Sequence, residues 1–120
     1  FMIRKLVVKM DATKYMTALA NEVDLDTAQD TYKGENESYL TFNYEDEKPS
    51  LFADNEVLQD TAYLQIHLFT PSTMNYQSLK RTIRDYLESI SFFVTSIMTF
   101  EEDDIDKKHT VFTVEYSEGR

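Results

Sequence analysis

Residues 62–77 read AYLQIHLFTPSTMNYQ, and they predict the end of a buried strand, a turn and the start of a helix. Between residues 58 and 70 the aliphatic residues fall on even positions and give one face of a strand the character of a protein core; they are Leu58, Ala62, Leu64, Ile66 and Leu68. Pro71 cannot donate a ladder hydrogen bond and should end the strand, and Asn75 suits the N-cap of the helix that follows. The odd positions form a mixed face, which includes Tyr63, Gln65, His67 and Phe69.

The segment after Asn75 has the clearest helical periodicity in the chain. Apolar residues recur every three or four positions, with charged residues mostly opposite them. This pattern predicts an amphipathic helix whose apolar stripe consists of Tyr76, Leu79, Ile83, Tyr86, Leu87 and Ile90.

Upstream, the stretch TYKGENESYLTFNYED (31–46) alternates with a period of two. We expect two strands joined by a tight hairpin at KGEN, where Gly34 can adopt a positive φ. In the second of these strands, Leu40 and Phe42 share a face with Tyr44. The following stretch, EDEKPSLFADN (45–55), should be a loop because it contains Pro49 and several turn-favouring Asp and Asn residues.

The segments near the two ends of the chain also have the periodicity of helices and strands. One or two helical segments are expected within residues 1–26, the second carrying Tyr15, Met16 and Leu19, although IRKLVV (3–8) also fits a strand. Near the C-terminus, FFVTSIMTF (92–100) and HTVFTVEY (109–116) predict two strands separated by the acidic turn EEDDIDKK (101–108).

The resulting element order is α-β-β-β-α-β-β within a single domain spanning residues 1–120. Its sheet and helix core would span residues 27–116, after an N-terminal helical segment at 1–26. Strands that follow one another along the chain favour antiparallel pairing. The sequence therefore predicts an α+β fold, with a largely antiparallel sheet of about four to five strands and helices packed on one face.

Composition narrows the possible functions. The 120-residue chain contains no Cys, which excludes disulfides and thiolate chemistry within it. Its net charge is −10, which repels nucleic-acid phosphates and argues against specific nucleic-acid binding. No apolar run is long enough to cross a membrane, and we expect no membrane partner.

No group of residues has the spacing of a catalytic or metal site. The run Glu101, Glu102, Asp103, Asp104 and Asp106 lacks both the ligand spacing and the glycine of a calcium loop, so a solvated turn is expected. His67 and His109 fall on different predicted strands and fit structural or surface roles better than catalysis. Ser72 and Thr73 lack the flanking glycines of a nucleophile turn and are expected to cap the helix. We therefore expect no enzyme activity, no metal and no cofactor.

Several short motifs, taken together, resemble those of a known family. They are YLTF (39–42) with Tyr44, Pro49, FADNE (52–56), YLQIHLF (63–69), the helical Tyr76, Leu79, Ile83 and Leu87, and the acidic turn leading to Lys108 and His109. Over residues 27–116 the chain resembles the small tail-completion proteins, similar to tail terminators, of long-tailed bacteriophages and prophages of Gram-positive bacteria.

The resemblance implies a structural protein of the virion tail that assembles in the host cytoplasm. It would form a ring, commonly a hexamer, at the head-proximal end of the tail, binding copies of itself, the major tail tube protein and a head connector or stopper protein. Tyr63, Gln65, His67 and Phe69 are the expected protein-interface residues. A head–tail connector or stopper of the same neck region, an acidic DNA-mimic inhibitor and a small metal-dependent enzyme remain alternatives.

Overall fold

The computed structural model describes residues 11–54 and 56–119. The expected α+β fold is confirmed, with helices and strands in the predicted order and one short 3-10 turn between the last two strands. The elements are α2 (Thr13–Val23), β1 (Asp26–Gln29), β2 (Tyr39–Ala53), β3 (Glu56–Pro71), α3 (Gln77–Ser89), β4 (Phe93–Glu102), η1 (Asp103–Ile105) and β5 (Lys107–Gly119).

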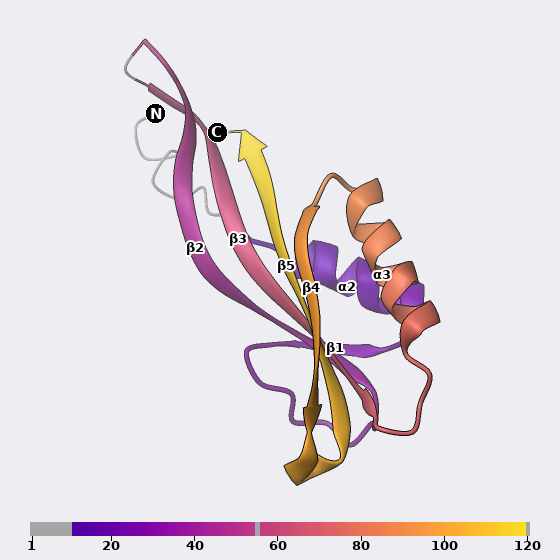
Figure 1. Cartoon of the computed structure of the whole chain (residues 1–120). Coiled ribbons are helices and arrows are strands. Elements are labelled where there is room, and N and C mark those ends of the chain that lie inside the picture. Colours follow the sequence, from indigo (N-terminus) through magenta and orange to yellow (C-terminus); the bar gives the residue numbers. More distant parts are fainter. Residues whose placement is uncertain (1–10, 55, 120) are drawn as a thin grey trace.

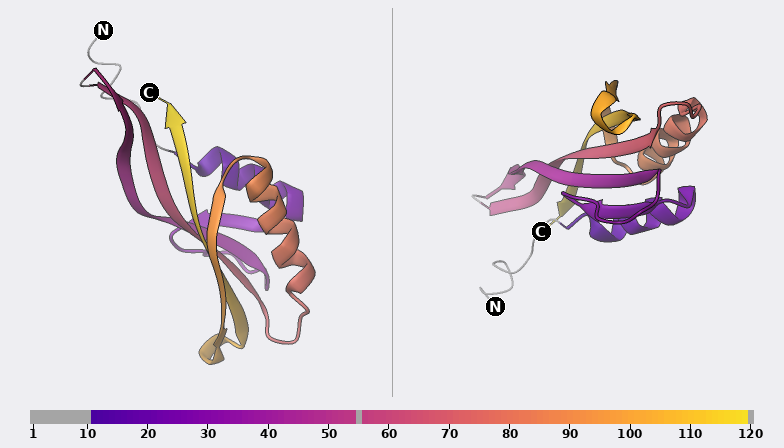
Figure 2. Two further views of the ribbon diagram at one scale, coloured as in Figure 1. Left: turned by 45° about the horizontal axis from the view of Figure 1, so that its top comes forward. Right: turned by 90° about the horizontal axis from the view of Figure 1, so that it is seen from below.

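The strands form a single five-stranded sheet with the spatial order β1-β2-β3-β5-β4. All neighbours pair antiparallel except β1 and β2, which are parallel. Helices α2 and α3 cover the same face of this sheet, and the long β2–β3 hairpin extends beyond them (Figure 1). The views in Figure 2 show the strong twist of the sheet and the hairpin projecting away from the helical end.

The core lies between the helices and the even-numbered face of β3. Leu64, Ile66 and Leu68 are all 0% exposed, as the alternation of the sequence predicts. They pack against apolar residues of both helices, of the neighbouring strands and of the α3–β4 connection, namely Met16, Leu19, Leu40, Phe42, Ile83, Leu87, Phe92, Phe112 and Val114. The hydrophobic effect on this face is the main force that stabilises the fold.

Helix α2 matches the second helical segment expected near the N-terminus, whereas the expectations for residues 1–10 lie outside the described residues. The Tyr44 hydroxyl accepts a hydrogen bond from the Ala12 backbone N–H at 2.6 Å, so β2 fixes the start of α2. The helix ends at Asp24, which adopts a left-handed conformation with φ 56°. Most of the predicted apolar stripe of α3 faces the core, with Ile83 and Leu87 fully buried. Tyr76 does not, because it is the N-cap residue and its ring lies near Lys80 and Lys108.

The predicted hairpin at KGEN is wrong. β1 runs parallel to β2, and the connecting segment 30–38 returns the chain so that Asp26 pairs with Tyr39. Hydrogen bonds close this loop, because Asp26 Oδ2 accepts from Tyr32 Oη and from Asn36 Nδ2, each at 2.8 Å. The positive φ of 65° falls at Asp30, not at Gly34.

The loop predicted at residues 45–55 is also wrong, because β2 continues as a strand to Ala53. β1 pairs only with residues 39–42 of β2. Beyond that point no strand among the described residues pairs with the outer edge of β2, so Pro49 can be accommodated there without breaking a ladder. The hairpin turns at Asp54, which has a φ of 51°.

The helix caps also differ from expectation. Asn75 Oδ1 accepts a hydrogen bond from the Gln77 backbone N–H at 3.1 Å, one residue before the N-cap residue Tyr76. Ser72, expected as a cap, instead donates its hydroxyl to the Glu101 carboxylate at 3.3 Å. The hydroxyl thus acts as a donor to a charged acceptor, whereas a helix N-cap would accept from a backbone N–H.

Candidate interaction surface

The face of the sheet opposite the helices, called here the helix-free face, carries the four residues predicted to make protein contacts. Tyr63, Gln65, His67 and Phe69 all lie on this face of β3, as the alternation predicts, and all are half-buried. The structure therefore brings the four residues together in one row. Their role as an interface stays a prediction.

Two of these residues make lateral contacts with β2. Gln65 Nε2 donates a hydrogen bond to Glu45 Oε2 at 3.2 Å. The Lys48 ammonium lies 5.5 Å from the centre of the Tyr63 ring, within the range of a cation–π contact. Part of the polar and aromatic surface of β3 is thus already engaged by its neighbour strand.

A row of stacked rings crosses the helix-free face. Ring centres are 4.1 Å apart between Tyr32 and Tyr39, 4.9 Å between Tyr39 and Phe69, and 4.2 Å between Phe69 and His109, and all three pairs are stacked. Phe100 continues the row on β4, with its ring centre 6.1 Å from that of His109. Strand register explains the row, since Tyr39 pairs with Phe69, Phe69 with His109 and Phe100 with His109. Such cross-strand ring pairs tie the strands together side by side.

A chain of polar contacts runs beside this row and joins four strands. His67 Nε2 lies 2.7 Å from Asn43 Oδ1, and His67 Nδ1 lies 2.6 Å from His109 Nε2. His109 Nδ1 lies 2.9 Å from Glu102 Oε1. Burial lowers the pKa of His67, and the neighbouring His109 lowers it further. The sequence did not indicate this pairing, because it depends on the register between β3 and β5.

The outer strand β4 presents the most exposed apolar side chains on this face. Phe93 is 66% exposed, Met98 54% and Phe100 44%. By register they lie opposite Glu115, Val111 and His109 of β5, which places them on the helix-free face. Residues 93–100 contain no charged residue, and within the described part of the chain nothing pairs with the outer edge of β4.

The opposite edge of the sheet is formed by β2 beyond Phe42, where residues 11–54 and 56–119 provide no further pairing strand, and it has a different character. Its residues Glu45, Asp46, Glu47 and Lys48 are exposed and charged, and Pro49 follows them. A register shift between Tyr44 and Asp46 adds a bulge. Charges, proline and bulges are the devices that keep sheet edges from pairing with other chains, so this edge is protected and the β4 edge is not.

Two carboxylates next to the acidic turn, those of Glu101 and Glu102, contact Lys108 and His109 of β5, whereas Asp103, Asp104 and Asp106 are exposed. Glu101 Oε1 accepts from Lys108 Nζ at 2.6 Å, and this hydrogen bond lowers the pKa of Glu101. Glu102 contacts His109, as described above. Within residues 11–54 and 56–119, no group of three or more His, Asp or Glu side chains is placed to hold a metal ion.

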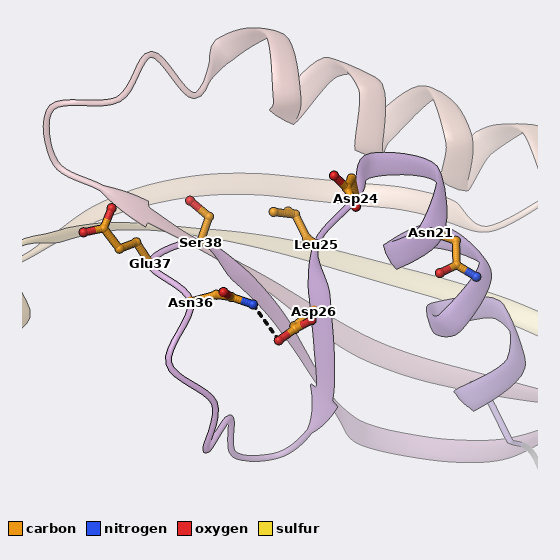
Figure 3. Close-up of a pocket in the computed structure, with 7 residues that line it drawn as sticks. All are labelled: Asn21, Asp24, Leu25, Asp26, Asn36, Glu37 and Ser38. Atoms are coloured by element: carbon orange, nitrogen blue, oxygen red, sulfur yellow. Dashed lines mark hydrogen bonds between the residues drawn. The ribbon is translucent and has the colours of Figure 1, made fainter.

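A shallow polar pocket of about 540 Å³ lies at the C-terminal end of α2. Asp26 lines it from β1 and Glu37 from the loop before β2, and the Asp26 carboxylate is bound by Asn36 (Figure 3). Asn21, Asp24, Leu25 and Ser38 complete the lining. Because the Asp26 contacts close the 30–38 loop, we assign these groups a structural role.

Comparisons with known proteins support the fold and leave the function open. No protein-family profile and no curated protein match the sequence. One solved structure, of a protein named only by a sequence code, shares the fold with a TM-score of 0.53 at 13% identity, over 93% of this chain and 97% of the other. None of the helices in the described part of the chain is long and apolar enough to cross a membrane.

Proposed function

We propose that this chain is a structural tail protein of a long-tailed bacteriophage or prophage, a tail terminator or tail-completion protein. It would act by forming a ring of six copies at the head-proximal end of the tail tube. The support begins with the order and spacing of the motifs over residues 27–116. The α+β fold agrees with the subunit that this resemblance implies.

The contrast between the two free edges of the sheet is the observation that carries the proposal. The β4 edge is uncharged over residues 93–100 and exposes Phe93, Met98 and Phe100, whereas the β2 edge is charged and interrupted by Pro49. An unprotected apolar edge on a small protein indicates a surface that another chain covers. We assign it to contact between neighbouring subunits.

A closed ring needs a second, different patch on each subunit, because neighbouring copies meet head to tail. We assign this role to the helix-free face of β3, with Tyr63, Gln65, His67 and Phe69 as contacts to a neighbouring subunit or to the tube. Aromatic side chains on this surface suit protein contacts, because they combine a large apolar area with little conformational freedom to lose on binding.

The charge of the chain is consistent with a place on the path of the genome. A net charge of −10 makes the surface repel DNA phosphates, so DNA could pass through a ring without binding to it. The same charge is compatible with an acidic DNA-mimic inhibitor. The two proposals differ in whether copies of the chain bind one another and a tail tube, or a DNA-binding protein.

Electron microscopy of the purified chain, alone and mixed with a purified tail tube protein, tests the proposal. We expect closed rings with a central opening, or a cap at one end of each tube. Genes for a portal and a major tail protein beside the gene of this chain would support the same assignment. A chain that stays monomeric, leaves tubes uncapped and binds a DNA-processing enzyme would contradict it and favour the mimic.

A further inference from the structure

His67 and His109 meet end to end on the helix-free face. Their facing nitrogens, Nδ1 of His67 and Nε2 of His109, are 2.6 Å apart, and the ring centres are 4.9 Å apart. The distance between the ring centres is about equal to the N···N distance plus the radius of each ring. The two nitrogens therefore lie close to the line that joins the ring centres. This is the geometry of a short, straight N–H···N hydrogen bond.

The outer nitrogen of each ring is fixed by an oxygen atom. His67 Nε2 faces Asn43 Oδ1 at 2.7 Å, and His109 Nδ1 faces Glu102 Oε1 at 2.9 Å. An amide or carboxylate oxygen accepts, so with the Asn43 amide in this orientation both outer nitrogens carry a hydrogen. If both rings were neutral, the two facing nitrogens would then point lone pair against lone pair. A third proton between them removes this conflict, and the His–His pair then carries one positive charge beside Glu102.

A metal ion would also satisfy two lone pairs, but the geometry disfavours it. A metal bound by two imidazoles sits off the line between them and takes further ligands, commonly four in all for zinc. No third His, Asp or Glu ligand converges on the facing nitrogens within the described residues. A proton fits the straight arrangement, and a metal ion does not.

We propose that His67 and His109 share one proton in a hydrogen bond that joins β3 to β5 on the helix-free face. We also propose that binding of a further proton in mild acid breaks this hydrogen bond. The further proton would go to His67 Nδ1, where it would meet the N–H of His109 Nε2 and its positive charge. The inference stands on these contacts alone and is independent of the proposed function.

Few charged groups near the pair can offset a second positive charge. From β4, Glu102 is already bound to His109, and from β2, Glu45 is bound by Gln65. Asn43 of β2 is neutral, and Lys107 of β5 lies 5.7 Å from the centre of the Tyr39 ring, where it adds positive charge to the face. The surroundings therefore support one shared proton and oppose another.

The sign of the pH effect follows from the lowered pKa of His67. The unfolded chain binds a proton at His67 below about pH 6.5, whereas the folded chain binds it at a lower pH. Between these two values the unfolded state holds more protons, so folding stability falls as the pH falls. Above about pH 6.5 the sign reverses, because the folded pair keeps its shared proton while the unfolded imidazoles are neutral, so folding stability rises as the pH falls toward 6.5.

Nitrogen NMR of the histidine side chains in the whole, unmodified chain tests the proposal directly. At pH 7.5 we expect His109 with hydrogens on both nitrogens and His67 with hydrogen on Nε2 alone, and we expect His67 to gain its second hydrogen in a separate step at lower pH. Two neutral rings at pH 7.5, with the Asn43 amide donating to His67, would overturn it. So would His67 carrying two hydrogens at that pH.

Melting temperatures of matched variants give a second readout. Between pH 6.5 and 5.5 the wild type should lose more of its melting temperature than His67→Gln, which cannot take up the second proton. Asn43→Asp places a carboxylate against His67 and should reduce that loss. An equal loss in wild type and His67→Gln would overturn the proposal. A rise of several degrees on adding Zn²⁺ would also overturn it, in favour of a metal ion.

Discussion

The two faces of the sheet are stabilised in different ways, and β3 shows both. On the helix-covered face Ala62, Leu64, Ile66 and Leu68 are aliphatic and fully buried, so stability comes mainly from apolar area removed from water. On the helix-free face the alternate residues are half-buried and contact their neighbours sideways through ring stacking and hydrogen bonds. Substitutions one residue apart can therefore separate the two kinds of stabilisation.

The largest expected effect is on the helix-covered face. Ile66→Ala should lower the free energy of unfolding by about 3 kcal/mol, because it leaves a cavity in a site that is 0% exposed. The neighbouring Gln65→Ala loses a hydrogen bond to an exposed carboxylate and should cost about 0.5 kcal/mol. Urea unfolding of both variants measures the difference. Equal losses would show that the two faces contribute alike.

An intermediate effect on the free energy of unfolding is expected in the row of stacked rings on the helix-free face. Phe69→Ala removes a half-buried ring that stacks on both Tyr39 and His109, and should cost about 2 kcal/mol. Phe69→Leu keeps most of the apolar area but loses the stacking, and about 1 kcal/mol of destabilisation should remain. The same unfolding measurement applies. A Phe69→Leu variant as stable as the wild type would mean that ring geometry contributes nothing here.

A smaller effect of opposite sign is expected at the end of β3. Thr70 is 0% exposed, and its hydroxyl has no hydrogen-bond partner among the described residues. Thr70→Val removes this buried hydroxyl and should raise the free energy of unfolding by about 1 kcal/mol. The matched control is Thr110→Val, which breaks the 3.1 Å contact with Thr99 and should destabilise by a similar amount. A loss of stability in Thr70→Val would contradict the assignment.

The fold could be predicted where the spacing of apolar residues along a single segment determines its secondary structure and its buried face. Period-two alternation in β3 predicted both of its faces, and helical periodicity predicted the buried stripe of α3 with Ile83 and Leu87. The predictions failed where the structure depends on pairing between strands that are far apart in the sequence. β1 is too short to signal its parallel partner, and the extension of β2 through Pro49 depends on an edge that β1 leaves free.

The candidate surface could be predicted only in part, for the same reason. The alternation placed Tyr63, Gln65, His67 and Phe69 on one face, but His67 and His109 meet because Phe69 pairs with His109 in the β3–β5 register. The stretch FFVTSIMTF predicted a strand without showing that it lies at the edge of the sheet. Only the strand order makes Phe93, Met98 and Phe100 exposed.

Sedimentation velocity over a range of protein concentrations tests most directly the central claim, that β4 is an edge where copies of the chain meet. We expect reversible association of the wild type, and a monomer with unchanged melting temperature for Met98→Lys, because Met98 is 54% exposed. Ile105→Lys is the matched control, since Ile105 is 51% exposed but lies in η1 outside the strand, and it should associate normally. A wild type that stays monomeric at all concentrations, or a Met98→Lys variant that associates as the wild type does, would contradict the account.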